Sequence, residues 1–302
     1  MNTPLKLAAF GLGLVAVFGA AVGVGSAVGP VGPALESSSD DHATDAGAGA
    51  GHDADTHGAA ALPTGLAVSE SGYTLDLADD VLPAGAATPV AFRVLGPEGS
   101  PVTEYDVDHD VDLHLIAVRR DLTGFQHVHP ELGADGVWRI PLALDPGTWR
   151  LFADFSPTAL GEKLTLGADL AVPGDYAPAP LPAESRTAEV DGFTVALTGE
   201  LEPGRDSELT LTVSRDGRPV TDLQPYLGAY GHLVVLRDGD LAYLHAHPEE
   251  GGAAAPGPDV RFATTAPSAG TYRLFLDFKH DSVVRTAAFT VAAATGHEEG
   301  GS

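Results

Sequence analysis

Short apolar runs alternate with turn residues along most of the chain after residue 62. Leu209 to Val213 alternates Leu and Thr, and Pro89 to Leu95 and Leu274 to Phe278 have the same strand-like composition. Turn signals such as Asp216-Gly217 and Asp238-Gly239 separate the runs. No stretch beyond residue 32 has a helical period. The pattern therefore predicts an all-β protein.

Three segments occur twice, at an offset of 118 to 123 residues, and this indicates an internal repeat. The pairs are Gly72-Tyr73-Thr74-Leu75 with Gly192-Phe193-Thr194-Val195, Gly99-Ser100-Pro101-Val102-Thr103 with Gly217-Arg218-Pro219-Val220-Thr221, and Trp149-Arg150-Leu151-Phe152 with Tyr272-Arg273-Leu274-Phe275. We therefore expect two domains, repeat one (63–173) and repeat two (187–293), joined by a semi-rigid Pro-rich linker at 174–186. Short strands over roughly 110 residues predict an immunoglobulin-like or cupredoxin-like β-sandwich in each.

The N-terminal segment 1–32 predicts a membrane anchor. Residues 7–31 are apolar and uncharged, and their length suits a transmembrane helix. Lys6, on the short N-terminal side, favours a single pass through the cell membrane with the later residues on the extracytoplasmic side. The small residues Gly25-Ser26-Ala27 keep a cleaved signal peptide, followed by secretion, as the alternative.

The composition limits the partners and the kinds of metal site that the chain can have. Residues 33–62 lack an apolar period and predict a disordered acidic linker that contains histidines, and 294–302 predict a disordered tail. The net charge of −26 disfavours nucleic acid as a partner and raises the local concentration of cations. The chain has no Cys, and its one Met is the initiator. Disulfides, thiolate metal sites and thioether sites for Cu(I) are therefore excluded.

The strongest chemical signal is a histidine pattern that lies inside the repeat. It occurs in both copies with the same spacing of 13 and then 2 residues, although the sequence between the histidines differs. The residues are His114, His127 and His129 before Pro130, and His232, His245 and His247 before Pro248. An imidazole triplet at fixed spacing in two otherwise divergent copies is a candidate metal site in each.

Hairpin geometry predicts that each triplet shares one face of its sheet. A type I′ turn at Asp238-Gly239 would place His232 opposite His245, and His247, two residues along, would share their face. In repeat one the same register needs a turn at Arg120-Asp121. The stretch from Asp121 to Gly124 has better turn chemistry but would shift that register and carry His114 away from His127.

Three imidazoles suit Zn(II) or Cu(II), so a copper or zinc ion is the expected cofactor, with up to two ions per chain. Asp154 and Asp277 occupy matching places in otherwise apolar strands and are candidate ligands as well. A buried carboxylate needs a partner, and a metal ion or a ligating imidazole would be one. The structural alternative is that these imidazoles and carboxylates only hydrogen-bond nearby loops.

A resemblance to a known group of proteins follows from the two motif regions, 112–130 and 226–248, with their His-x-His-Pro ends. They resemble exported, membrane-anchored proteins of actinobacteria that contain tandem immunoglobulin-like domains. The resemblance covers most of residues 63–293. It implies handling of heavy metals, copper above all, and carries over only the six motif histidines.

The sequence therefore predicts an extracytoplasmic protein that binds divalent metal ions as a chaperone, buffer or sensor. Metal ions are the expected partners, the N-terminal helix contacts the membrane, and a membrane metal transporter is a further candidate partner. The first alternative is a non-catalytic structural or adhesion module with tandem immunoglobulin-like domains. The second is a copper enzyme of the superoxide dismutase type, whose disulfide cysteines this chain lacks. Hydrolase and phosphate-binding motifs are absent, so no enzymatic activity is predicted.

Overall fold

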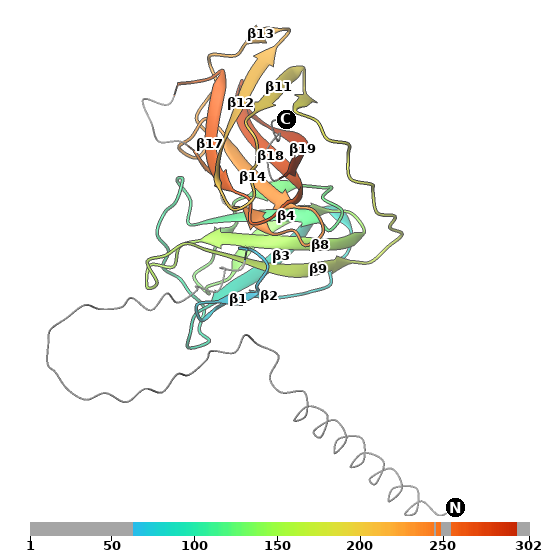
Figure 1. Cartoon of the computed structure of the whole chain (residues 1–302). Coiled ribbons are helices and arrows are strands. Elements are labelled where there is room, and N and C mark those ends of the chain that lie inside the picture. The colour runs from blue at the N-terminus through green and yellow to red at the C-terminus, as the bar shows by residue number, and fades with distance from the viewer. Residues whose placement is uncertain (1–62, 245, 249–254, 295–302) are drawn as a thin grey trace, which may run out of the picture. The chain divides into compact units, whose positions relative to one another are not determined.

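The computed structural model describes residues 63–302 except 245, 249–254 and 295–302. Residues 58–302 form one compact unit. The predicted anchor, the acidic linker and nearly all of the predicted tail lie outside the described residues. In the described part every regular element is a strand, so none of it offers an apolar helix of membrane-spanning length (Figure 1). The prediction of an all-β protein is confirmed.

Repeat one is a sandwich of two antiparallel sheets. One sheet has the order β1-β2-β3-β7-β6 and the other the order β5-β4-β8-β9. The strands are β1 (Ser69–Glu70), β2 (Tyr73–Leu77), β3 (Gly85–Leu95), β4 (Leu113–Arg119), β5 (Gln126–Val128), β6 (Glu131–Leu132), β7 (Trp138–Leu144), β8 (Gly147–Phe155) and β9 (Leu164–Val172).

Repeat two has the same plan. Its sheets have the orders β10-β11-β12-β17-β16, with β13 paired to β12, and β15-β14-β18-β19. The strands are β10 (Thr187–Val190), β11 (Phe193–Thr198), β12 (Asp206–Arg215), β13 (Arg218–Pro219), β14 (His232–Arg237), β15 (Tyr243–Leu244), β16 (His247–Pro248), β17 (Asp259–Thr265), β18 (Gly270–His280) and β19 (Val283–Ala293). The tandem β-sandwich predicted from the repeat is confirmed.

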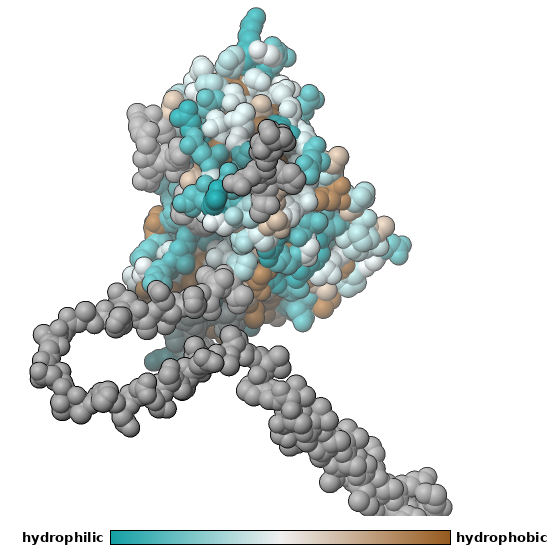
Figure 2. Space-filling view, viewed as in Figure 1, coloured by the Kyte–Doolittle hydropathy of each residue, from teal (hydrophilic) through white to brown (hydrophobic). Residues whose placement is uncertain are grey.

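Each sandwich has its own apolar core between its sheets. The alternation of β3 turns Val90, Phe92 and Val94 inward in repeat one, where they meet Trp138 and Trp149. Phe193, Phe262 and Phe289 lie in the corresponding core of repeat two. On the face shown in Figure 2, the described residues are mainly hydrophilic or intermediate, with apolar residues in smaller patches. Period-two patterning of this kind directs the apolar side chains of a strand to one face.

Strands β4 and β14 depart from that alternation because both of their faces are buried. Their inward residues join the two sandwich cores, and their outward residues meet in a third cluster between the repeats. We call this third group the interdomain cluster. Its buried members are Ile116, Val118, Leu122 and Phe152 from repeat one, and Val234, Leu236, Leu241, Tyr243 and Phe275 from repeat two.

The interdomain cluster is built from matching positions of the two copies. Ile116 and Val234 differ by the repeat offset, and so do Phe152 and Phe275. The two repeats therefore use the same face of the same sheet against each other, as in a two-fold symmetric dimer interface. The segment that enters repeat one also joins both repeats, because the Thr64 carbonyl accepts a hydrogen bond from the Tyr243 N–H and the Gly65 carbonyl accepts one from Arg150. The outward faces of β4 and β14 thus become interior surface.

Candidate metal centre

The hairpins that present the histidines have a different register from the predicted one. In repeat two, β14 and β15 pair Val235 with Leu244, a register that aligns position 232 with 247 rather than with 245. In repeat one, β4 and β5 pair Ile116 with His127, which aligns 114 with 129. The prediction that His232 lies directly opposite His245 is therefore wrong. The two copies nevertheless share one register, as the equal spacing predicted.

Turn geometry explains the difference. In repeat one the Leu122 N–H donates to the Arg119 carbonyl, so the turn is centred on Arg120 and Asp121, and Leu122 follows as an extra residue with positive φ. In repeat two Asp238 does not have positive φ, whereas Gly239 and Leu241 do, so the connection is longer than a two-residue type I′ turn. The turn moves the pairing by two residues in both copies. A shift of two keeps every side chain on its face, whereas a shift of one would reverse it.

In repeat one the structure brings the predicted triplet together. One ring nitrogen each of His114, His127 and His129 lies within 4.8 Å of the others. The ring centroids of His129 are 5.1 Å from those of both partners. The sequence pattern thus predicted a real convergence of imidazoles.

His232 of repeat two does not form a separate site in the described structure but faces the triplet of repeat one. Its ring centroid is 6.2 Å from that of His114 and 6.0 Å from that of His127. Residue 245 and the side chain of His247 lie outside the described part of the chain. The backbone of His247 belongs to β16, which pairs with β17 in the opposite sheet. Four histidines of the described residues thus meet at the interface, His114, His127, His129 and His232, which we call the histidine cluster.

An oxygen acceptor lies against one ring nitrogen in three of these histidines. His127 Nδ1 is 2.8 Å from Oδ2 of Asp277, across the repeat interface. His232 Nε2 donates to the Tyr226 carbonyl at 2.7 Å, and His114 Nε2 lies 3.4 Å from the Asp108 carbonyl. Such outer hydrogen bonds fix the tautomer of an imidazole and leave the other nitrogen as a ligand.

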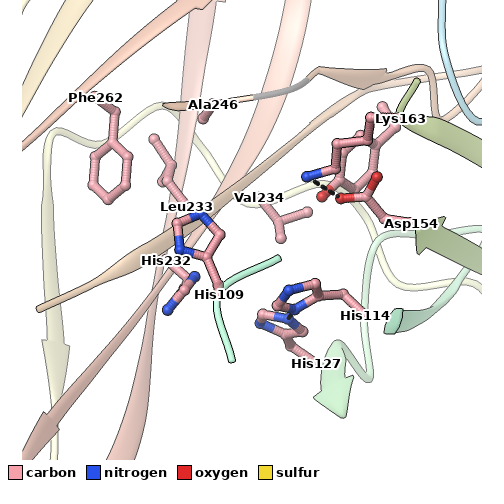
Figure 3. Close-up of a pocket in the computed structure, with 11 residues that line it drawn as sticks. His109, His114, His127, Asp154, Lys163, His232, Leu233, Val234, Ala246 and Phe262 are labelled. Atoms are coloured by element: carbon pink, nitrogen blue, oxygen red, sulfur yellow. Dashed lines mark hydrogen bonds and ion pairs between the residues drawn. The ribbon is translucent and has the colours of Figure 1, made fainter. Parts of the chain in front are cut away.

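The remaining nitrogens face one another or lack a partner. His114 Nδ1 and His127 Nε2 are 3.0 Å apart, joined by a dashed line in Figure 3. If His114 Nε2 and His127 Nδ1 carry the hydrogens, the facing atoms His114 Nδ1 and His127 Nε2 present lone pairs, because a neutral imidazole has a single N–H. Nε2 of His129 is buried without a hydrogen-bond partner among the described residues. In that tautomer no hydrogen lies between the two facing nitrogens, and a proton or a metal ion there would satisfy both lone pairs.

The two predicted aspartates have different surroundings. Asp277 pairs with His232 in the β14–β18 ladder, accepts a hydrogen bond from Thr286, and holds His127. Asp154 pairs with His114 in the β4–β8 ladder and also accepts from a threonine, Thr165.

The second oxygen of Asp154 lies 3.1 Å from the Lys163 ammonium (Figure 3). Asp277 thus touches the cluster through an imidazole, whereas Asp154 forms an ion pair beside it.

Burial keeps His114, His129 and His232 neutral. The pKa of His114 is lowered to about 2 by burial and then by its neighbours His127 and His129. Burial, followed by neighbouring histidines, lowers the pKa of His129 to about 4. The pKa of His232 is also lowered to about 4, first by burial, although its bond to the Tyr226 carbonyl opposes that shift. Neutral imidazole is the form that ligates metals.

These shifts predict a pH dependence of stability for the metal-free protein. Histidines with pKa values below 6.5 in the folded chain take up protons when the chain unfolds between pH 6.5 and about 4. As the pH is lowered across that window, the free energy of unfolding should fall by up to about 1.4 kcal/mol per pH unit for each such histidine. Urea denaturation at a series of pH values measures the slope. A His129→Gln, His232→Gln double variant should have a shallower slope, and an unchanged slope would contradict the assignment.

Sequence reasoning did not predict that His232 would join the triplet of the other repeat. A usable signal existed: Leu233-Val234-Val235-Leu236 is a continuous apolar run, which is typical of a strand buried on both faces. Tyr226 and Lys163 were not predicted as site residues, and no sequence pattern marks them.

Comparison with known proteins places the chain in a family. The DUF8832 model, a domain of unknown function, matches residues 67–173 and again 188–295. The chain belongs to the DUF8832 family. Two DUF8832 matches at the repeat spacing confirm the internal duplication. The actinobacterial origin and the copper handling implied by the resemblance stay predictions. No curated protein matches the chain.

Solved structures with a similar fold include two bacterial adhesins. FdeC of Escherichia coli is 16% identical with a TM-score of 0.24, over 76% of this chain and 66% of FdeC. InvE of Yersinia pseudotuberculosis is 11% identical with a TM-score of 0.22, over 74% of this chain and 59% of InvE. A Salmonella alpha-2-macroglobulin is 16% identical with a TM-score of 0.26, over 78% of this chain and 15% of that protein. The chain thus spans less than two thirds of each, and likeness at this level says nothing of what this chain binds.

Proposed function

We propose that this DUF8832 protein binds one divalent copper or zinc ion between its two repeats. The proposed ligands are His114, His127 and His129 of repeat one and His232 of repeat two. The observation that carries the proposal is the 3.0 Å approach of His114 Nδ1 to His127 Nε2, with an oxygen acceptor behind each ring. A metal ion on the inner side would satisfy both lone pairs and the unpartnered Nε2 of His129.

The donor set selects the class of ion. Imidazole nitrogens suit Zn(II) and Cu(II), whereas Mg²⁺ and Ca²⁺ prefer oxygen ligands. For Zn–N bonds of about 2.0–2.1 Å in a tetrahedron, the ligand nitrogens lie about 3.4 Å apart. The nitrogens of His114, His127 and His129, within 4.8 Å of one another, need to close by at most about 1.4 Å, which small side-chain rotations supply. The carboxylate of Asp277 would offset part of the ion's charge through His127.

Titration of the full chain with each ion tests the proposal. We expect one tightly bound Zn²⁺ or Cu²⁺ per chain near pH 7.5, measured by calorimetry and elemental analysis after removal of excess ion. The Cu(II)-loaded protein should have nitrogen hyperfine coupling in its electron paramagnetic resonance spectrum. A variant with Gln at all four proposed ligands is the matched control and should lose this tight ion. Retention of the same ion by that variant would refute the site.

A structural module is the second candidate, and the apolar interdomain cluster favours it. In this alternative His127 is an imidazolium that bridges Asp277 and His114, so a proton takes the place of the metal ion. The histidines would then only fix the repeats relative to each other, as an immunoglobulin-like adhesion or structural module requires. This alternative predicts that the wild-type chain binds no metal ion tightly. Gln replacements in the histidine cluster should then change only the stability of the protein.

The location and the partners complete the proposal. Export across the cell membrane, with residues 1–32 as anchor or as cleaved signal, would place both repeats on the extracytoplasmic side. A net charge of −26 favours capture of cations there. A chaperone, buffer or sensor role, with a membrane metal transporter as partner, fits a site that binds an ion without supplying catalytic groups.

A further inference from the structure

A strained turn carries a fifth histidine, His109, beside the histidine cluster. Asp108 and Val111 exchange both backbone hydrogen bonds, so His109 and Asp110 are the central residues of a two-residue turn. Both have positive φ, 49° and 64°, the conformation of a type I′ turn, which favours Asn and Gly. A residue with a Cβ atom is strained in this region of backbone conformation. Strain that Gly would relieve is a reason to look for a function of the His109 side chain.

The His109 ring lies at the edge of the histidine cluster. Its centroid is 5.2 Å from that of His232 and 6.3 Å from that of His114. The three line a small cavity of about 40 Å³, which Figure 3 shows with His109 and His232 on one side and His114 and His127 on the other. A cavity of this size has room for a water molecule.

Exposure distinguishes His109 from His114 and His232. About a third (33%) of its side chain is exposed, whereas His114 and His232 are 6% and 8% exposed. On this side of the cavity His109 is therefore open to solvent, whereas His114 and His232 are not. The carboxylate of Asp108, next to His109, lies 3.6 Å from its Nε2.

The turn is also connected to the cluster that it borders. The Asp108 carbonyl faces His114 Nε2, and the Asp108 carboxylate accepts from Lys163 at 2.6 Å. Lys163 in turn forms an ion pair with Asp154 of β8, the strand that pairs with β4. The position of His109 is therefore held by the same groups that orient His114.

From this geometry we infer that His109 is the entry ligand of the centre. It takes up the hydrated ion by replacing one water, and the buried imidazoles then replace the remaining waters and His109 itself. The inference rests on the proposed metal function and adds a kinetic role to it. An entry ligand lowers the barrier to both loading and release, and leaves the equilibrium affinity unchanged.

Rates of zinc transfer test the inference. The full metal-free chain is mixed with Zn²⁺ in a stopped-flow instrument with a chromophoric chelator as indicator, and release is followed after addition of excess chelator. We expect His109→Gln to slow loading and release by about tenfold, while the dissociation constant changes by less than about threefold. His109→Gly, which relieves the strained φ, should give the same slowing in a turn that still folds.

The outcomes separate this inference from the proposed function. Unchanged rates in both variants would overturn the entry role while leaving the ion site intact. A loss of affinity as large as that of His127→Gln would make His109 a permanent ligand and would also overturn it. Failure of the wild-type chain to take up any zinc would refute the proposed function, and the inference with it.

Discussion

Replacing His127 with Gln should lower the affinity for Zn²⁺ or Cu²⁺ by about 100- to 1000-fold. Structural zinc sites have apparent binding free energies of about 10–16 kcal/mol, or about 2.5–4 kcal/mol for each of four ligands. At about 1.4 kcal/mol per tenfold change, loss of one ligand gives the expected range. Gln keeps a polar side chain of similar reach, so Asp277 still has a hydrogen-bond donor. Competition with a chelator of known affinity measures the change.

His280 offers the matched control for this substitution. It is a buried histidine of repeat two, 8% exposed, but its ring contacts Phe193 and Asp222 instead of the histidine cluster. His280→Gln should leave the ion affinity unchanged. Asp277→Asn should have an intermediate effect of about 10- to 100-fold, because it weakens only the bond that orients His127. An equal loss in His280→Gln and His127→Gln would mean that the ion binds elsewhere.

Much of the fold follows from local sequence signals. Period-two alternation in β3 and β12, and the turn residues between the apolar runs, determine strands whose core faces can be read directly. The duplication identifies equivalent positions and therefore equivalent strands. The hairpin register was less predictable, because Asp238-Gly239 has the composition of a type I′ turn but a different conformation. The even shift of register left His114 and His127 on the predicted face.

The site was predictable only within one repeat. Spacing along a hairpin brings His114, His127 and His129 together, and the local geometry of a sheet suffices for that inference. The approach of His232 and Asp277 depends on how two folded sandwiches pack, which no local pattern specifies. The difference between the aspartates depends on a single residue near β9: Lys163 neutralises Asp154, and Val284 occupies the matching place beside Asp277.

Phe275→Ala should both destabilise the protein and weaken ion binding. Phe275 is 4% exposed and stacks on Phe125 across the repeat interface, with ring centroids 4.0 Å apart. Removing a buried phenyl ring typically lowers the free energy of unfolding by about 3–5 kcal/mol. Looser docking would also leave His232 and Asp277 in place for only a fraction of the time. The apparent affinity falls in proportion to that fraction, which we expect to be about one tenth, so the affinity should fall about tenfold.

Phe193→Ala separates the two effects. Phe193 is fully buried in the core of repeat two and does not belong to the interdomain cluster, so its loss should lower stability by a similar amount at unchanged ion affinity. Urea denaturation and chelator competition measure the two quantities on the same samples. Equal losses of affinity in Phe193→Ala and Phe275→Ala would show that general destabilisation, and not docking, controls the site.

A further background tests whether the ion truly joins the repeats. In a chain that already carries His232→Gln and Asp277→Asn, the two groups through which repeat two acts on the site are removed. Phe275→Ala should then cause no further loss of affinity, although it should still destabilise the fold by about 3 kcal/mol. Non-additivity of this kind is the energetic signature of an ion shared by both repeats. Fully additive losses would instead place the ion on the triplet of repeat one alone.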